Sequence, residues 1–398
     1  MRAPAYSWSI RLLASYLFAV SALFCASESS ANESDAKSSS IAIALSPHVE
    51  SVRNLGDQFL DNSVNVTGAD GATSLELSDA ASLWVFGDTV EGPFETIRGL
   101  DLTHLRSNTA AIVPRQPAAQ GIGEFHFLAT ADGKRPRQLI PYEADESPSL
   151  HRIWGVHGLQ HGQNVFLFYH RISLLPDVDV FANFRLDGMG VARSNVDELQ
   201  FARLMAPDGT REFWKGDQPT FGVFVDRRDD TVYLWGSLLT GMFLARVSPD
   251  RIDDLDAYEY LIEAPTKDDP HRPCRWGKKF HPTAVLFDGV PNEMSAAYNS
   301  FLKCYVAFHS WGRDHALVLR TAPEVWGPWS EPQLVYEPPR LGDDDLIYAA
   351  KEHPELARAD GRIVYLTYIN STTYVPQLVE VSLRREVPTV HSAEDSTP

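Results

Sequence analysis

The chain of 398 residues carries 53 acidic and 35 basic residues, which gives a formal net charge of −18 at pH 7. A surface this negative repels phosphate backbones and anionic lipids, so nucleic acid and membrane surfaces are not expected partners. Hydrophobic residues make up 44% of the chain and aromatic residues 11%, which is enough for a large buried core and argues against a disordered protein.

The N-terminus has the three-part pattern of a secretory signal peptide. Arg2 and Arg11 precede an apolar run at residues 12–24, and small residues follow up to Ala31. The run is too short for a membrane span, so we expect cleavage near Ala31 and a secreted or periplasmic protein without a membrane anchor. Cys25 leaves a lipid anchor as the alternative. The expected organisation is a signal peptide at 1–31, a flexible leader at 32–46, one folded domain at 47–387 and a disordered tail at 388–398.

Two cysteines, Cys274 and Cys304, remain after the signal peptide. They either form one disulfide in an oxidising compartment or stay separate thiols, and neither is flanked by ligands spaced for zinc. We expect that no cofactor is required. The acidic run at residues 343–345 either decorates a solvated loop or helps to bind a structural calcium ion.

Five short runs rich in aromatic and β-branched residues recur along the chain, at residues 83–86, 165–169, 232–235, 304–308 and 363–368. Such residues favour strands, and turn residues with an earlier apolar stretch precede most of the runs. Each run is therefore interpreted as the second strand of a hairpin. In several copies a third and a fourth strand-like segment follow in a shared register.

Four strands per copy and five copies, at intervals of roughly 60 to 80 residues, predict an all-β fold. The expected architecture is a five-bladed β-propeller, with four-stranded antiparallel blades around a central channel. A β-sandwich would also account for the strands, but not for the register that the copies share.

Two aspartates of the first copy are expected at one mouth of this channel. Because neighbouring strands of a blade are antiparallel, the residue before the first strand and the residue after the second share one rim. These residues are Asp70, followed by Gly71, and Asp88, in the turn Gly87-Asp88-Thr89. Cleavage of a glycosidic bond requires such a pair of carboxyl groups. The structural alternatives are a simple Asp-Gly turn at Asp70 and a loop cap at Asp88.

Further polar and aromatic residues are expected near the same mouth as candidates for substrate binding, with Trp154 as a platform for a sugar ring. The candidate set is Asn108, Trp154, His157, Asp217, Glu352 and His353. Glu293 precedes the fourth inner strand and is a further candidate, as are Trp214 and Trp311 for stacking. The alternative for the histidines is a structural role as hydrogen-bonded struts between blades.

Several segments together resemble a family of exported five-bladed propellers long catalogued as a domain of unknown function, some members of which are endo-D-arabinanases. The resemblance covers residues 64–383 and is carried by Gly68-Ala-Asp-Gly-Ala, Leu83-Trp-Val-Phe-Gly-Asp-Thr, Thr321-Ala-Pro, Gly327-Pro-Trp-Ser and Glu352-His-Pro-Glu-Leu. It implies an architecture similar to the five-bladed furanosidases and a glycoside hydrolase-like site with Asp70 and Asp88 as the essential carboxylates. The insertions at 173–187 and 263–282 depart from the family pattern, so D-arabinan is not carried over as the substrate.

The sequence therefore predicts a secreted glycoside hydrolase-like protein that acts on a furanose-containing or other extracellular polysaccharide or oligosaccharide. The alternative is a non-catalytic propeller that binds glycan or protein at the same mouth, because propellers host many functions. The sequence leaves open which aspartate is the acid and whether the reaction retains or inverts the anomeric configuration.

Overall fold

The computed structural model describes residues 43–78, 80–94, 100, 102–175, 184–238, 240–289, 293–311, 315–342 and 345–385. The predicted signal peptide, nearly all of the predicted leader, the predicted tail and two residues of the acidic run, 343 and 344, lie outside the described residues. No helix within the described ranges is long and apolar enough to cross a membrane. Cys274 and Cys304 are separate thiols, so the second alternative for the cysteines is correct.

Antiparallel strands form six sheets in the described chain, and five of these hold four or five strands each. The first contains β3 (Thr73–Ser78), β4 (Ala81–Val85), β7 (Ala110–Pro114) and β8 (His126–Phe127). The second contains β9 (His151–His161), β10 (Asn164–Leu174), β11 (Phe184–Asn195) and β12 (Ala202–Arg203), with β13 (Trp214–Lys215) paired to β11. The third contains β14 (Phe224–Arg228), β15 (Thr231–Leu238), β16 (Gly241–Val247), β17 (Glu259–Glu263) and β18 (Arg275–Gly277).

The fourth and fifth sheets follow in chain order, except that the fifth recruits the first strand of the chain. The fourth contains β19 (Met294–Asn299), β20 (Cys304–Trp311), β21 (Ala316–Ala322) and β22 (Gln333–Tyr336). The fifth contains β23 (Ile347–Glu352), β24 (Ile363–Asn370), β25 (Pro376–Leu383) and β1 (Val49–Asp57). The described helices are single 3₁₀ turns: η1 (Leu102–His104), η2 (Pro249–Arg251), η3 (Leu255–Ala257) and η5 (Pro354–Leu356).

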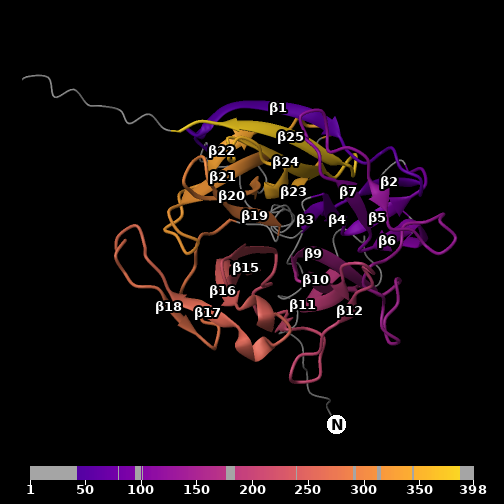
Figure 1. Ribbon diagram of the computed structural model, residues 1–398, viewed down its shortest axis with the longest axis horizontal. Coiled ribbons are helices and arrows are strands. Elements are labelled where there is room, and N and C mark those ends of the chain that lie inside the picture. Colours follow the sequence, from indigo (N-terminus) through magenta and orange to yellow (C-terminus); the bar gives the residue numbers. More distant parts are fainter. Residues whose placement is uncertain are drawn as a thin grey trace, which may run out of the picture.

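The five repeated runs of the sequence lie in β4, β10, β15, β20 and β24, each of which is the second strand of its sheet. Figure 1 shows the sheets arranged around a common centre, with β3, β9, β19 and β23 closest to it. The prediction of an all-β chain built from four-stranded antiparallel sheets is confirmed. The count of five blades stays a prediction.

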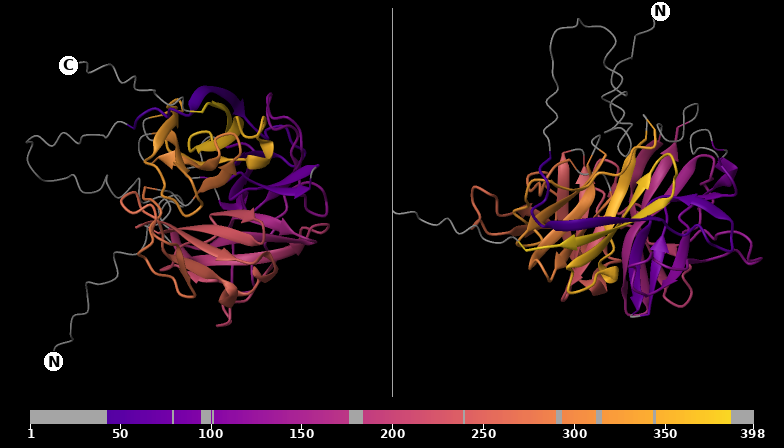
Figure 2. Two further views of the ribbon diagram at one scale, coloured as in Figure 1. Left: turned by 60° about the vertical axis from the view of Figure 1, so that its left-hand side comes forward. Right: turned by 90° about the horizontal axis from the view of Figure 1, so that it is seen from above.

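The sequence did not predict that β1 would complete the last sheet. Val52 of β1 pairs with Val381 of β25, so the first described strand closes the edge left by the last one. Both views of Figure 2 show β1, in indigo, beside the yellow C-terminal strands. Most β1 side chains are exposed or partly exposed, without the alternation that marks a strand with one buried face, which is why the pattern did not reveal it.

A sixth, three-stranded sheet holds one of the two predicted catalytic aspartates. It consists of β2 (Val66–Ala69), β5 (Asp88–Glu91) and β6 (Leu105–Ser107). The prediction of a turn at Gly87-Asp88-Thr89 is therefore wrong. The chain leaves β4 after Val85 and enters a new strand, β5, at Asp88. Asp88 thus stands at the junction of two sheets, where the backbone is held from both sides.

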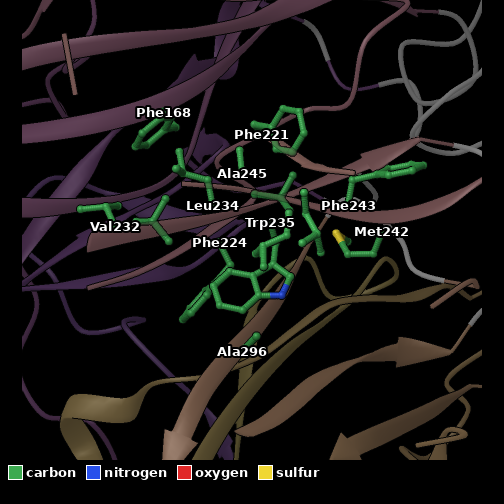
Figure 3. Packing of buried hydrophobic residues seen from close by; sticks show 14 of the residues in the cluster. Phe168, Phe221, Phe224, Val232, Leu234, Trp235, Met242, Phe243, Ala245 and Ala296 are labelled. Carbon is green, nitrogen blue, oxygen red and sulfur yellow. The ribbon is translucent and has the colours of Figure 1, made fainter. Parts of the chain in front are cut away.

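The largest hydrophobic cluster packs the second, third and fourth sheets against one another. Figure 3 shows Trp235 of β15 among side chains that include Phe168 of β10, Phe224 of β14 and Ala296 of β19. Trp235 and Phe168 have no exposed surface. Burying a large apolar side chain stabilises a fold by about 1.5–3 kcal/mol, so these contacts fix the inner strands whose ends carry the polar residues described next.

Candidate active site

Asp70 and Asp88 are bound to each other through their backbones and through one carboxylate. The Asp88 amide donates to Asp70 Oδ1 at 2.8 Å, and the Asp70 amide donates to the Asp88 carbonyl at 3.1 Å. The Gly87 amide also donates to the Asp70 carbonyl, at 3.0 Å. The structure therefore brings together the two aspartates that the strand order placed at one rim.

Two glycines permit this close approach. Gly71 has φ +77°, a conformation that glycine adopts without strain, and a Cβ there would lie 3.0 Å from the Gly87 amide nitrogen. A Cβ on Gly87 would lie 2.6 Å from Asp70 Oδ1, closer than real Cβ contacts occur. The Asp70-Gly71 pair does form a turn, and this turn places the Asp70 carboxylate next to Gly87.

The Asp70 carboxyl group is surrounded by groups that favour its neutral form. Burial, followed by the charges of Asp88 and Glu293, raises the pKa of Asp70 to about 7, although hydrogen bonds from the Asp88 backbone and the Tyr374 hydroxyl act in the opposite direction. The Tyr348 hydroxyl also donates to Asp70 Oδ2, at 3.2 Å. A carboxyl group with such a pKa can give or take a proton near neutral pH.

Asp88 has a different set of neighbours. Only 5% of its surface is exposed, and this burial raises its pKa, while the charge of Arg152 and the side chain of Ser107 oppose the shift. Arg152 Nε lies 3.5 Å from Asp88 Oδ2, and the arginine side chain is almost fully buried. Arg152 is the cation that supports the ionised form of Asp88.

A third carboxylate, that of Glu293, lies close to Asp70 and is held by Lys351. Lys351 Nζ binds Glu293 Oε1 at 2.9 Å, the Gly71 carbonyl at 2.6 Å and Thr73 Oγ1 at 3.1 Å. Through these bonds the lysine, which is only 3% exposed, connects the fourth and fifth sheets to the loop that carries Asp70. The ion pair with Lys351 thus fixes the position of the Glu293 carboxylate near Asp70.

The predicted binding residues divide between the site and its surroundings. Trp154 is partly buried, and its ring comes 3.9 Å from the Cβ position of Gly87, so it belongs to the site. Asp217 is exposed in the turn before β14, and no described contact connects it to either aspartate. Trp214 is 1% exposed and its Nε1 donates to the Tyr260 hydroxyl, so it is a core residue and cannot stack on a sugar.

Asn108 and His157 are buried structural groups. Asn108 has no exposed surface: its Nδ2 donates to the Ile153 carbonyl and its Oδ1 accepts from the Ile140 amide, so its amide connects the first and second sheets. His157 accepts the Val225 amide at 3.3 Å, and burial, with the charge of Lys351, lowers its pKa to about 3. Both side chains therefore have a structural role, as buried hydrogen-bonding groups between sheets.

Glu352 and His353 lie beyond the site, at the end of β23. His353 is 1% exposed, and its two ring nitrogens lie 2.7 Å from Ser74 Oγ and 2.8 Å from Thr367 Oγ1. It therefore has a structural role as well. Burial, followed by the charge of Glu355, raises the pKa of Glu352 to about 8, and no contact with Asp70 or Asp88 is described. Tyr348, near the start of β23, is the residue of this strand that reaches Asp70 directly, and a register shift follows between Tyr348 and Lys351.

Sequence reasoning missed Tyr348, Tyr374, Lys351 and Arg152. The two tyrosines and the lysine come from the fifth sheet and reach the first sheet across more than 270 residues of chain, as the Tyr348–Asp70 separation of 278 shows. Within the described residues, no group of three or more His, Cys, Asp or Glu side chains is placed to hold a metal ion.

Comparisons with known proteins place the chain in a family and a fold. In solved structures it is similar to a proposed hydrolase from Bacteroides ovatus ATCC 8483, with 14% identity, a TM-score of 0.59, and coverage of 89% of this chain and 97% of that one. It is also similar to a GH43_1 enzyme from Xanthomonas citri (11% identity, TM-score 0.47, 86% and 96% coverage). A third similar structure is Zg3597, a family 117 glycoside hydrolase from Zobellia galactanivorans (11% identity, TM-score 0.43, 83% and 90% coverage).

The search of curated proteins found no match. The family match, by contrast, extends over residues 56–380 and so includes both aspartates and every described sheet. The chain belongs to the family described as Domain of unknown function (DUF4185).

Proposed function

We propose that this protein is a glycoside hydrolase that cleaves an extracellular polysaccharide with the Asp70–Asp88 pair, at the mouth of a five-bladed propeller. The observation that carries the proposal is the pairing of two buried carboxyl groups in unlike surroundings. The pKa of Asp70 is raised to about 7 among two carboxylates and two tyrosines, while Asp88 lies beside Arg152. Such a difference between neighbouring carboxyl groups allows one to act as acid and the other as anion.

In this mechanism Asp70 is the general acid. It is protonated at the start of the reaction and gives its proton to the oxygen of the leaving sugar as the glycosidic bond breaks. Asp88, whose ionised form Arg152 supports, acts from the other side as the base that activates water or as the nucleophile. Trp154 supplies an apolar ring face against which a sugar can pack.

The fold supports the proposal without deciding the substrate. The Bacteroides ovatus structure is itself that of a proposed hydrolase, and its 14% identity carries the fold alone. Among the structural neighbours, the Xanthomonas citri GH43_1 enzyme has also been solved with xylotriose. For this chain, the substrate class is therefore derived from its own residues below.

The test is hydrolysis of a panel of cell-wall and plant polysaccharides by the purified protein, measured as released reducing ends. Asp88→Asn is expected to lower the rate at least about a thousandfold, because the anion is lost while the shape is kept. Asp250→Asn is the matched control, since Asp250 is exposed and paired only with His161. Undiminished hydrolysis by Asp88→Asn would refute the mechanism. Glycan binding without any released ends would instead support the non-catalytic alternative.

A further inference from the structure

A groove of about 660 Å³ opens beside Asp88. Its wall includes β6, with Arg106 and Ser107, and segments that contribute Arg135, Tyr142 and Pro148. None of these residues was singled out by the sequence, and the mechanism proposed above does not use the groove.

The wall of the groove is in contact with the candidate active site. Ser107 pairs with Asp88 across β5 and β6, and its side chain is one of the groups that lower the Asp88 pKa. The Pro148 carbonyl accepts a hydrogen bond from Arg152, the cation beside Asp88. Tyr142 is close enough that the charges of Arg152 and Asp88 both affect its pKa. The groove and the aspartate pair therefore lie on two sides of the same β6 residue, Ser107.

The groove has an excess of positive charge in a strongly acidic protein. Arg106 and Arg135 line it with side chains 33% and 49% exposed, and both pair with the single carboxylate of Glu91, which is 10% exposed. Arg106 Nε lies 2.5 Å from Glu91 Oε1, and Arg135 Nε lies 2.7 Å from Glu91 Oε2. His104 adds a third nitrogen-bearing side chain, and no Asp or Glu lines the groove in the part of the chain described. One carboxylate cannot neutralise two guanidinium groups.

A second groove provides the contrast. It is larger, about 820 Å³, and residues 262–288 and 320–331 contribute most of its wall. Four cations line it, but so do three carboxylates that pair with them: Glu331 with Lys267, Glu263 with both Arg272 and Arg275, and Asp288 with Arg320. Basic residues alone therefore do not distinguish the groove beside Asp88. That groove is distinguished by the absence of acidic residues from its described wall.

We propose that the groove beside Asp88 binds an anionic substituent of the glycan substrate through Arg106 and Arg135. The substrate class is then an acidic polysaccharide, one whose sugars carry carboxylate or sulfate groups, rather than a neutral one. The guanidinium group suits this role because its planar fork of N–H donors matches carboxylate and other oxyanions. This proposal rests on the proposed function, since it concerns the substrate of the same site.

The test measures binding without turnover, by titration calorimetry on the full chain carrying Asp88→Asn. The probes are three trisaccharides of equal length: galacturonic acid trimer, a sulfated galactose trimer and neutral galactotriose. We expect an acidic trimer to bind at least about tenfold more tightly than galactotriose, and to weaken as NaCl is raised from 50 to 500 mM, because salt screens exposed charges. The acidic trimer that binds better identifies the substituent.

Arg106→Gln and Arg135→Gln are tested one at a time, so that Glu91 keeps one arginine and the fold is preserved. Each should weaken binding of the acidic trimer about tenfold and leave galactotriose unaffected. Arg193→Gln is the control, because this exposed arginine pairs with Asp253 far from the groove wall. Equal binding of the neutral trimer, unchanged affinity in both single variants, or no binding of any probe would overturn the proposal.

The two proposals fail in different ways. If an acidic trimer binds through the two arginines but no polysaccharide is ever cleaved, the hydrolase mechanism fails and the groove assignment stands. If a neutral polysaccharide is cleaved equally well by the wild-type protein and both arginine variants, the hydrolase mechanism stands and the groove assignment fails.

Discussion

Two buried carboxylates in neighbouring sheets, Glu146 and Asp70, have opposite electrostatic environments. Burial favours the neutral form of Glu146, but hydrogen bonds from Arg203, the Glu143 backbone and Arg171 outweigh it and lower the Glu146 pKa to about 2. At Asp70, burial acts together with the charges of two other carboxylates, and the pKa rises to about 7. Two arginines contact Glu146, whereas the charges that act on Asp70 are carboxylates, and Asp70 is also the more deeply buried of the two.

The comparison separates a structural carboxylate from a reactive one. Glu146 Oε2 lies 2.7 Å from Arg203 and its Oε1 lies 2.7 Å from Arg171, so it is permanently ionised and joins three segments of the second sheet. Asp70 has hydroxyl and amide donors but no cation in direct contact. A buried carboxylate with two arginines holds a fold together, whereas one among other carboxylates is prepared to exchange a proton.

The largest expected effect comes from removing the charge of Glu146. Glu146→Gln leaves the Arg203 guanidinium, which is 1% exposed, without its anion, and breaking a buried pair in this way costs about 3–5 kcal/mol of folding free energy. Chemical denaturation at pH 7 measures it. The matched control is Glu143→Gln three residues away, whose partly exposed pair with Arg211 should contribute under about 1 kcal/mol. Equal losses in the two variants would contradict the structural role of Glu146.

For Asp70 we expect the opposite effect on stability: removal of its charge should stabilise the fold. Folding raises its pKa from 3.8 to about 7, so between these pH values the folded state holds a proton that the unfolded chain has lost. The stability that this proton contributes is present below about pH 4 and is lost as pH rises to about 7. Asp70→Asn removes this loss. We expect its thermal midpoint to exceed that of the wild-type protein by about 3 °C at pH 8, and to match it at pH 4. Asp250→Asn, which removes an exposed carboxylate, is the control. A lower midpoint for Asp70→Asn at pH 8 would refute the raised pKa.

The aspartate pair could be predicted from sequence because it depends on the order of strands alone. Asp70 precedes the first strand of its sheet and Asp88 follows the second, and antiparallel pairing brings these two ends together whatever the rest of the fold does. The same argument explains why Glu352 and His353 lie elsewhere: they stand at the end of β23, the first strand of the fifth sheet, whereas Asp70 precedes the first strand of its own sheet.

The groups that tune the pair could not be predicted, because they depend on how distant sheets meet. Tyr374 and Ala349 both have positive φ, 54° and 56°, where a glycine would have indicated the loop that places Tyr374 and the irregularity of β23 beside Tyr348. Arg152 and Arg106 appear in the sequence as ordinary charged residues. Only the packing of the second sheet against β5 and β6 shows that one supports Asp88 and the other faces a groove.

The smallest expected effect is a shift in the pH dependence of activity when the charge of Glu293, near Asp70, is removed. If Asp70 is the general acid, kcat/KM falls as pH rises through about 7, when its proton is lost. Glu293→Gln removes one of the charges that raise the Asp70 pKa, so the fall should begin at a pH lower by roughly half a unit. Lys351 keeps its bonds to Gly71 and Thr73 in this variant, so the loop retains its support. Glu76→Gln, which removes an exposed carboxylate paired with Arg115, should leave the profile in place. If the profile of Glu293→Gln moved to higher pH, the proton lost near pH 7 would not belong to a carboxyl group destabilised by its anionic neighbours, and Asp70 could not be the acid.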